Sequence, residues 1–278
     1  MKRREEIRIR DPFIYTDREA GCYYMYGTTD FVSENSPLTA RRFTVYRSLD
    51  LENFDDGKTI FDGEKNGFWG TMNYWAPEMH KYRGKYYLFA TFKSEDRHRG
   101  TQILVSDAPD GEFRPISDGP ATPHEWECLD GTLFIDGDVP YMVFSHEWTE
   151  IKDGAICAVR LSDDLSRTIG EPVTLFHASD NASVTELHAG SGNYVTDGPF
   201  LYREDGKIKM IWSSFEHGRY LVIGAYADTL TGKWTHTPSL FDFNGGHAMI
   251  FESLSGERMI SLHSPNHAGL ERAVFHKI

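Results

Sequence analysis

Short runs of apolar and aromatic residues, separated by turn-forming residues, dominate the chain from end to end. No stretch of a dozen residues repeats apolar positions at intervals of three and four, as an amphipathic helix would. The runs instead have the length and the aromatic content of β-strands. Turns such as Arg83-Gly84-Lys85 and Asp136-Gly137-Asp138 separate them. The pattern therefore predicts an all-β chain of many short strands.

One plan recurs five times along this chain. Each segment begins with an acidic residue or a histidine, continues through a short apolar strand and a tight turn, and returns through a second, more apolar strand. The five lead residues, 50 to 67 positions apart, are Asp11, Glu78, Asp130, Asp197 and His247. Repeats of this length with roughly four strands each are typical of β-propellers. Residues 1–278 are therefore predicted to form a single five-bladed β-propeller.

The lead residues are expected to meet at one place. The innermost strand of each blade lines the central channel of a propeller, and every lead residue stands at the start of a predicted inner strand. Packing does not require four carboxylates to converge, and like charges held close together oppose one another's ionisation. Their convergence therefore points to a functional site at the mouth of the channel.

Carboxyl groups on opposite sides of such a mouth suit the hydrolysis of a glycosidic bond with inversion. One carboxyl protonates the leaving oxygen while the other activates a water molecule, across a gap of about 6.5–9.5 Å. A third carboxyl nearby raises the pKa of the proton donor and keeps it protonated at neutral pH.

Composition and charge narrow the partners and the compartment. A formal net charge of −13 opposes nucleic-acid binding, which depends on Lys and Arg. No apolar segment of a secretory signal and no run of about 18 apolar residues occurs, so a cytoplasmic enzyme without membrane contact is predicted. The three cysteines, Cys22, Cys128 and Cys157, lack metal-site spacing and are expected to be buried free thiols.

Five landmarks together resemble glycoside hydrolase family 43, over roughly residues 8–275. They are Arg10-Asp11-Pro12, Trp75-Ala76-Pro77-Glu78, Leu129-Asp130-Gly131, Asp197-Gly198-Pro199 and Gly246-His247. The resemblance implies a five-bladed β-propeller and an inverting enzyme that acts on plant-type poly- or oligosaccharides. It favours an exo-acting α-L-arabinofuranosidase, with β-xylosidase and galactofuranosidase or galactosidase as alternatives.

The resemblance also implies catalytic roles. Asp11 matches the general base, and Asp130 matches the acid that tunes the pKa of the proton donor and orients the substrate. The proton donor of the family is usually a Glu before Gly-Pro, where this chain has Asp197, whose side chain is one methylene shorter. Glu147 is therefore the first alternative proton donor, and Glu78 is the second.

A metal and several sugar contacts are also expected near the mouth. His247 resembles the channel histidine of the family, which often contacts a central calcium through water, so Ca²⁺ is an expected cofactor; a buried structural role is the alternative. Zinc is disfavoured because no His/Cys ligand spacing occurs. The predicted substrate-binding residues are Trp75, Glu78, His146, Trp148, His247, His263 and Arg272, with Phe31, Trp69 and Tyr74 beside them. For the aromatic residues blade packing is the alternative, and for Arg272 it is a surface ion pair.

Two other classes of function compete with an enzyme. A propeller that binds carbohydrate without catalysis is favoured by Asp197 in place of Glu and opposed by the retention of Asp11 and Asp130. A WD40- or kelch-type scaffold is disfavoured because the repeats lack the Gly-His and Trp-Asp pairs of such blades.

Overall fold

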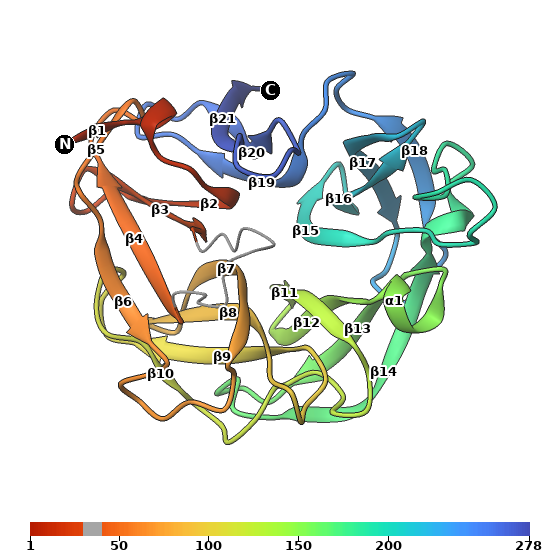
Figure 1. Cartoon of the computed structure of the whole chain (residues 1–278), viewed down its shortest axis with the longest axis horizontal. Coiled ribbons are helices and arrows are strands. Elements are labelled where there is room, and N and C mark those ends of the chain that lie inside the picture. The colour runs from red at the N-terminus through yellow and green to blue at the C-terminus, as the bar shows by residue number, and fades with distance from the viewer. Residues whose placement is uncertain (30–40) are drawn as a thin grey trace.

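The computed structural model describes residues 1–29 and 41–278. Five antiparallel sheets surround one central axis (Figure 1), which confirms the predicted five-bladed β-propeller. The strand nearest the axis is the first of each repeat. These inner strands are β2 (Arg10–Asp17), β7 (Met72–Tyr82), β11 (Cys128–Asp136), β15 (Asp197–Glu204) and β19 (Gly246–Glu252).

Each blade grows outward from its inner strand through hairpins. The second strands are β3 (Cys22–Thr28), β8 (Lys85–Lys93), β12 (Val139–His146), β16 (Lys207–Glu216) and β20 (Arg258–Ser264). The third strands are β4 (Arg42–Ser48), β9 (Gly100–Ser106), β13 (Ala155–Leu161), β17 (Arg219–Ala227) and β21 (Arg272–Lys277). The outer edges are formed by β1 (Lys2–Arg3), β5 (Asn53–Phe54), β6 (Lys58–Asp62), β10 (Arg114–Pro115), β14 (Thr168–His177) and β18 (Thr235–Ser239).

In residues 1–29 and 41–278, helical structure is confined to single turns. These are η1 (Arg4–Glu6), α1 (Trp148–Ile151) and η2 (Ala178–Asp180). None of the helices among the described residues is long and apolar enough to cross a membrane.

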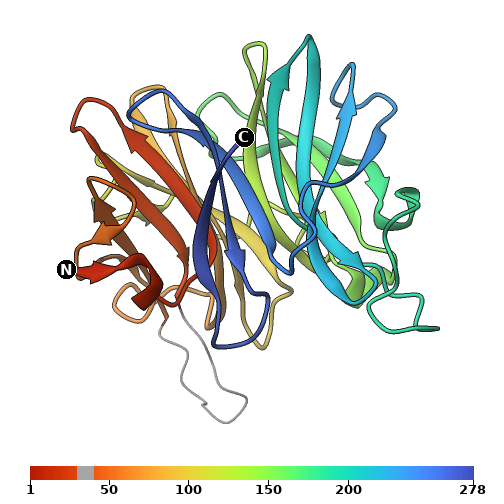
Figure 2. The ribbon, with the colours of Figure 1, turned by 90° about the horizontal axis from the view of Figure 1, so that it is seen from above.

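The two ends of the chain close the ring. Arg8 forms a β-bridge with Arg272, and the backbone N–H of Ile9 donates to the carbonyl of Glu271 at 3.3 Å. The N-terminal segment therefore lies beside the C-terminal strand β21, as both views of the ribbon show (Figures 1 and 2).

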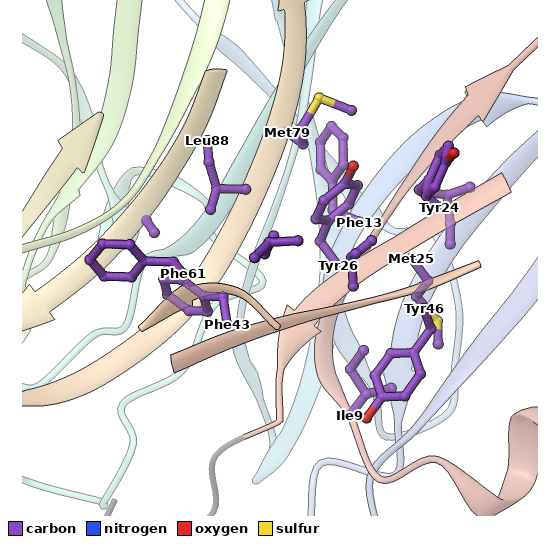
Figure 3. Close-up of a cluster of buried hydrophobic side chains, with 14 of the residues drawn as sticks. Ile9, Phe13, Tyr24, Met25, Tyr26, Phe43, Tyr46, Phe61, Met79 and Leu88 are labelled. Atoms are coloured by element: carbon purple, nitrogen blue, oxygen red, sulfur yellow. The ribbon is translucent and has the colours of Figure 1, made fainter. Parts of the chain in front are cut away.

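Apolar side chains fill the spaces between neighbouring blades. Phe43 and Phe61 of blade 1 pack toward Leu88 of blade 2 in the largest cluster (Figure 3). Trp212 is fully buried in a second cluster between blades 3 and 4. Burying a side chain of this size stabilises the fold by about 1.5–3 kcal/mol. Blade packing, which the repeat alone predicts, therefore accounts for most of the aromatic content.

Several residues that were expected at the mouth or in the core lie within the blades. Tyr74 is 1% exposed, and Trp69 packs against the largest cluster. Neither side chain therefore lies at the mouth, where both were expected. Their rings fill the interface between blades 1 and 2 instead, where the ring centroids of Tyr74 and Phe92 lie 4.8 Å apart. Phe31 lies outside the described residues. The three cysteines are buried and free, as predicted.

Candidate active site

A backbone irregularity recurs at the start of every inner strand. The register with the second strand shifts across three residues, as it does between Arg10 and Phe13 on β2. The residue just after the start of each shift has a φ between 42° and 56°. These five residues are Asp11, Ala76, Asp130, Gly198 and His247. β-Bulges of this kind re-aim side chains and are over-represented next to active sites.

The bulges correct the alignment of the repeats. Asp11, Asp130 and His247 share the positive-φ position near the start of their inner strands. Asp197 stands one residue before that position, which Gly198 occupies. Glu78 stands two residues after it, because Ala76 occupies the equivalent place in blade 2. The sequence repeat therefore identified the right segments but placed two lead residues out of step.

Side chains of the preceding blade bond to four of the five bulges. The donor N–H groups and their acceptors are Asp11 and His263 Nδ1 (3.2 Å), Ala76 and Thr28 Oγ1 (2.8 Å), Asp130 and Thr91 Oγ1 (3.0 Å), and His247 and Ser213 Oγ (2.8 Å). The equivalent Ser145 hydroxyl has no hydrogen-bond partner among the described residues. The N–H of Gly198 donates to Asp130 Oδ2 at 3.0 Å instead. Asp130, a candidate catalytic residue, therefore makes the hydrogen bond that links blades 3 and 4 here.

Donors and positive charges hold Asp11 as a carboxylate. The Thr28 hydroxyl donates to Oδ2 at 2.6 Å, and Oδ1 lies 3.2 Å from His247 Nδ1. Burial opposes ionisation, but His247, His263 and the adjacent Arg10 outweigh it and hold the pKa of Asp11 well below its ordinary value.

Asp130 and Asp197 are shifted in the opposite direction. Burial raises the pKa of Asp130 to about 8, against the opposing effect of His247. Burial also raises the pKa of Asp197 to about 6, opposed by His247 and by the Tyr220 hydroxyl, which donates to Oδ2 at 3.0 Å. This pair therefore retains a proton near neutral pH while Asp11 retains none. Carboxyls whose environments separate their pKa values in this way are the usual acid and base of an active site.

His247 lies among these acids. Its Nδ1 is 3.7 Å from Asp130 Oδ2, and its Nε2 is 4.0 Å from Glu78 Oε1. Burial opposes protonation, but the charges of Asp11, Asp130 and Glu78 raise the pKa of His247. Nε2 is buried without a hydrogen-bond partner among the described residues, and so is the second oxygen of Glu78, Oε2, which lies 3.4 Å from His80 Nε2 in an ion pair.

One cavity of about 380 Å³ brings most of the predicted site together. Its size suits a small-molecule or sugar site. Seven of the predicted residues line it: Asp11, Trp75, Asp130, Glu147, Trp148, Asp197 and His247.

Glu147 is bound differently from the three aspartates. It is 6% exposed and accepts hydrogen bonds from the Arg99 guanidinium and, at 2.6 Å, from the Thr149 hydroxyl. Both partners are donors, so Glu147 is arranged as an acceptor rather than as a proton donor.

Four predicted substrate-binding residues do not line the cavity: Glu78, His146, His263 and Arg272. Glu78 lies further along β7, and His263 supports the backbone of Asp11. His146 instead stacks on Trp126, with ring centroids 4.2 Å apart. Arg272 donates to backbone carbonyls near the N-terminus. Direct sugar contact by these four residues stays a prediction; their absence from the cavity wall could not be foreseen, because sequence position does not show on which side of a strand a side chain lies.

Eight other cavity residues were not among the predicted site residues, and three of them, Arg10, Thr28 and Tyr220, adjoin or bond to the acids. Arg10 adjoins Asp11 and forms an ion pair with Glu271 at 3.3 Å, whereas Tyr220 comes from the third strand of blade 4. Of these three residues, only Thr28 could have been found from a pattern in the sequence. A Thr, Ser or His stands at the same place in the second strand of every blade, at 28, 91, 145, 213 and 263.

Two solved structures of known proteins resemble this fold over nearly its whole length. An endo-arabinase from Bacteroides thetaiotaomicron VPI-5482 superposes with a TM-score of 0.90 and 40% identity, covering 99% of this chain and 96% of that one. A thermostable family-43 glycoside hydrolase superposes with a TM-score of 0.82 and 25% identity, covering 97% and 89%.

More distant relatives are found by sequence. A probable arabinan endo-1,5-alpha-L-arabinosidase C of Aspergillus niger is 23% identical over 200 residues, which cover 65% of this chain and 57% of that protein. The arabinan endo-1,5-alpha-L-arabinosidase A of Aspergillus aculeatus is 22% identical over 221 residues, which cover 74% and 58%. The chain thus spans less than two thirds of the length of these two relatives.

The family model of Glycosyl hydrolases family 43 matches residues 6–276. This match covers all five blades and confirms the resemblance drawn from the five landmarks. The chain therefore belongs to glycosyl hydrolase family 43.

Proposed function

We propose that this enzyme cleaves α-L-arabinofuranosyl linkages of arabinan with inversion. The observation that carries the mechanism is the opposite pKa shift of Asp11 and Asp197 within one cavity. Inverting glycosidases need a carboxylate and a carboxylic acid on opposite sides of the scissile bond. The choice of arabinan is supported by the 40% identical endo-arabinase and by the two fungal arabinosidases.

In the proposed reaction Asp11 removes a proton from a water molecule that attacks the anomeric carbon. Asp197 gives its proton to the leaving oxygen as the bond between this oxygen and the anomeric carbon breaks. Asp11 ends protonated and Asp197 ionised, and exchange with solvent restores both. Asp130 holds the Gly198 N–H next to Asp197, and its burial favours a proton on the pair.

Cleavage within the arabinan chain is the first candidate, because the endo-arabinase covers nearly all of this chain. Release of terminal sugars, as in the exo-acting α-L-arabinofuranosidase expected from the sequence, is the second. The test is a time course on linear α-1,5-arabinan with chromatography of the products. Early oligosaccharides support internal cleavage, and arabinose alone supports terminal cleavage.

The substrate proposal can fail in two distinct ways. Turnover of a β-D-xyloside, β-D-galactofuranoside or β-D-galactopyranoside, with arabinan untouched, would replace the sugar. A folded protein that cleaves none of these substrates would favour the carbohydrate-binding alternative.

A comparison of two variants tests the acid. Asp197→Asn should reduce turnover strongly on arabinan and less on an aryl arabinofuranoside, whose leaving group needs little protonation. Asp11→Asn should abolish turnover on both substrates. If Glu147→Gln shows the leaving-group pattern and Asp197→Asn does not, Asp197 is not the proton donor.

We also propose Ca²⁺ at the central axis, next to His247 and Glu78. Both residues carry a buried atom without a hydrogen-bond partner in the described parts of the chain. In the described parts of the chain, no group of three His, Cys, Asp or Glu side chains could hold a metal ion directly. The surroundings therefore fit a hydrated ion bound largely through water. Such an ion would supply positive charge close to the acids.

A further inference from the structure

Arg99 stands behind the wall of the cavity without lining it. It directly precedes β9, and its side chain is 12% exposed. Its backbone is fixed on both sides, since its N–H donates to Glu127 Oε2 at 3.1 Å and its carbonyl accepts from the Cys128 N–H at 2.9 Å. The guanidinium therefore approaches the cavity from a rigid base.

Three groups that line the cavity converge on this guanidinium. Nε donates to Asn73 Oδ1 at 3.4 Å, and another nitrogen donates to the Glu147 carboxylate. The guanidinium carbon lies 4.8 Å from the ring centroid of Trp75. Arginine alone combines a planar face for an indole with several donors in one plane.

The three lining groups are those that a sugar requires. The Glu147 carboxylate accepts hydrogen bonds from hydroxyl groups, the Trp75 indole packs on the apolar face of a ring, and the Asn73 amide can donate and accept. They come from two blades. Asn73 and Trp75 lie on β7, where Asn73 has a positive φ of 54°, and Glu147 follows β12. Their common geometry therefore depends on what holds them together.

We infer that Arg99 is a positioning residue that assembles Asn73, Trp75 and Glu147 into a binding surface for a second sugar residue, next to the one whose bond is cleaved. The inference rests on the proposed arabinan activity. This role of Arg99 explains why Glu147, an acid inside the cavity, accepts hydrogen bonds from both Arg99 and Thr149 on one oxygen, Oε2. Groups that contact only unreacting sugar bind the ground state and the transition state equally, so their loss raises KM more than it lowers kcat.

The test compares Arg99→Met with Arg258→Met on linear arabino-oligosaccharides. Arg258 is a matched control, since it forms an ion pair with Glu204 and lies 4.8 Å from the ring centroid of Tyr202. Its partners lie at the end of β15 remote from Asp197. Arg99→Met should raise KM about tenfold or more with kcat within about threefold, as for uniform binding. Arg258→Met should leave both constants unchanged.

Two further variants exclude a merely structural effect. Arg99→Lys keeps a charge for Glu147 and should recover part of the loss. The double variant Arg99→Met, Glu147→Gln leaves no unpaired buried carboxylate, so it should fold even if the single variant does not, and its KM should stay raised. A wild-type KM in the double variant, or equal kinetics of Arg99→Met and Arg258→Met, would overturn the inference.

A readout without turnover separates this inference from the proposed function. Crystal structures should show Trp75 and the side chain at position 147 displaced in the double variant, while the Arg258→Met protein keeps both in place. If they stay in place without Arg99, the inference fails even in an active enzyme. If they move but the wild type cleaves no arabinan, only the proposed substrate fails.

Discussion

Gly198 lies where the backbone of one blade meets the imidazole of the next, and Gly198→Ala should damage both stability and catalysis. A Cβ at this position would lie 2.7 Å from Cδ2, 2.8 Å from Cγ and 2.9 Å from Nε2 of His247. Real Cβ atoms do not approach a rigid ring so closely, so the ring or the backbone must move. The φ of 50° adds strain of about 1–2 kcal/mol for an L-residue, and overpacking adds about 1–3 kcal/mol.

The displaced ring should also affect the reaction. His247 Nδ1 lies 3.2 Å from Asp11 Oδ1, and the Gly198 N–H holds Asp130. A misplacement of about 1 Å near reacting groups lowers the rate by a factor on the order of 100. We therefore expect the free energy of unfolding to fall by about 2–4 kcal/mol, and kcat to fall on the order of a hundredfold.

Gly137→Ala provides the matched control. Gly137 has a φ of 64° in a hairpin turn, and a Cβ there would meet no atom within 4 Å. The control should therefore show the backbone strain alone, with normal kcat. Urea unfolding and steady-state kinetics of both variants measure the difference. Equal losses of stability with a normal kcat in Gly198→Ala would refute the proposed contact with His247.

The remaining predictions concern pH, packing and metal. Because the base Asp11 has a lowered pKa and the acid Asp197 a raised one, kcat/KM should stay level down to about pH 4 and fall as pH rises above about 6; a loss already at pH 5 would contradict this. Tyr220→Phe removes a hydrogen bond that favours ionised Asp197, so the alkaline limb of the pH profile should move to higher pH; a move to lower pH would reverse the assigned sign. Trp212→Ala should lower the free energy of unfolding by about 3–5 kcal/mol in urea titrations, because it opens a cavity between blades 3 and 4. EDTA should lower the melting temperature, and an unchanged melting temperature would argue against bound Ca²⁺.

Part of the site could be read from the sequence because it follows the repeat. Asp11, Asp130 and His247 each begin an inner strand, and strands are recognised from local alternation and turns. The offset of Asp197 and Glu78 could not be read, because a bulge inserts a residue without changing the local pattern of polar and apolar positions.

The sequence by itself determined the five-bladed architecture and the family, and it pointed to three acids that the structure brings into one cavity. Local hydrophobic periodicity and short turns specify strands and hairpins, and five similar segments can bury their apolar faces only against one another. Only the tertiary structure showed that Tyr220, from the third strand of the same blade, reaches Asp197, and that Arg99, from the neighbouring blade, reaches Glu147. It alone also placed the burial and the charges that lower the pKa of Asp11 and raise those of Asp130 and Asp197. These properties depend on distances between strands far apart in sequence and on exclusion from water, and no local pattern in the sequence encodes either one.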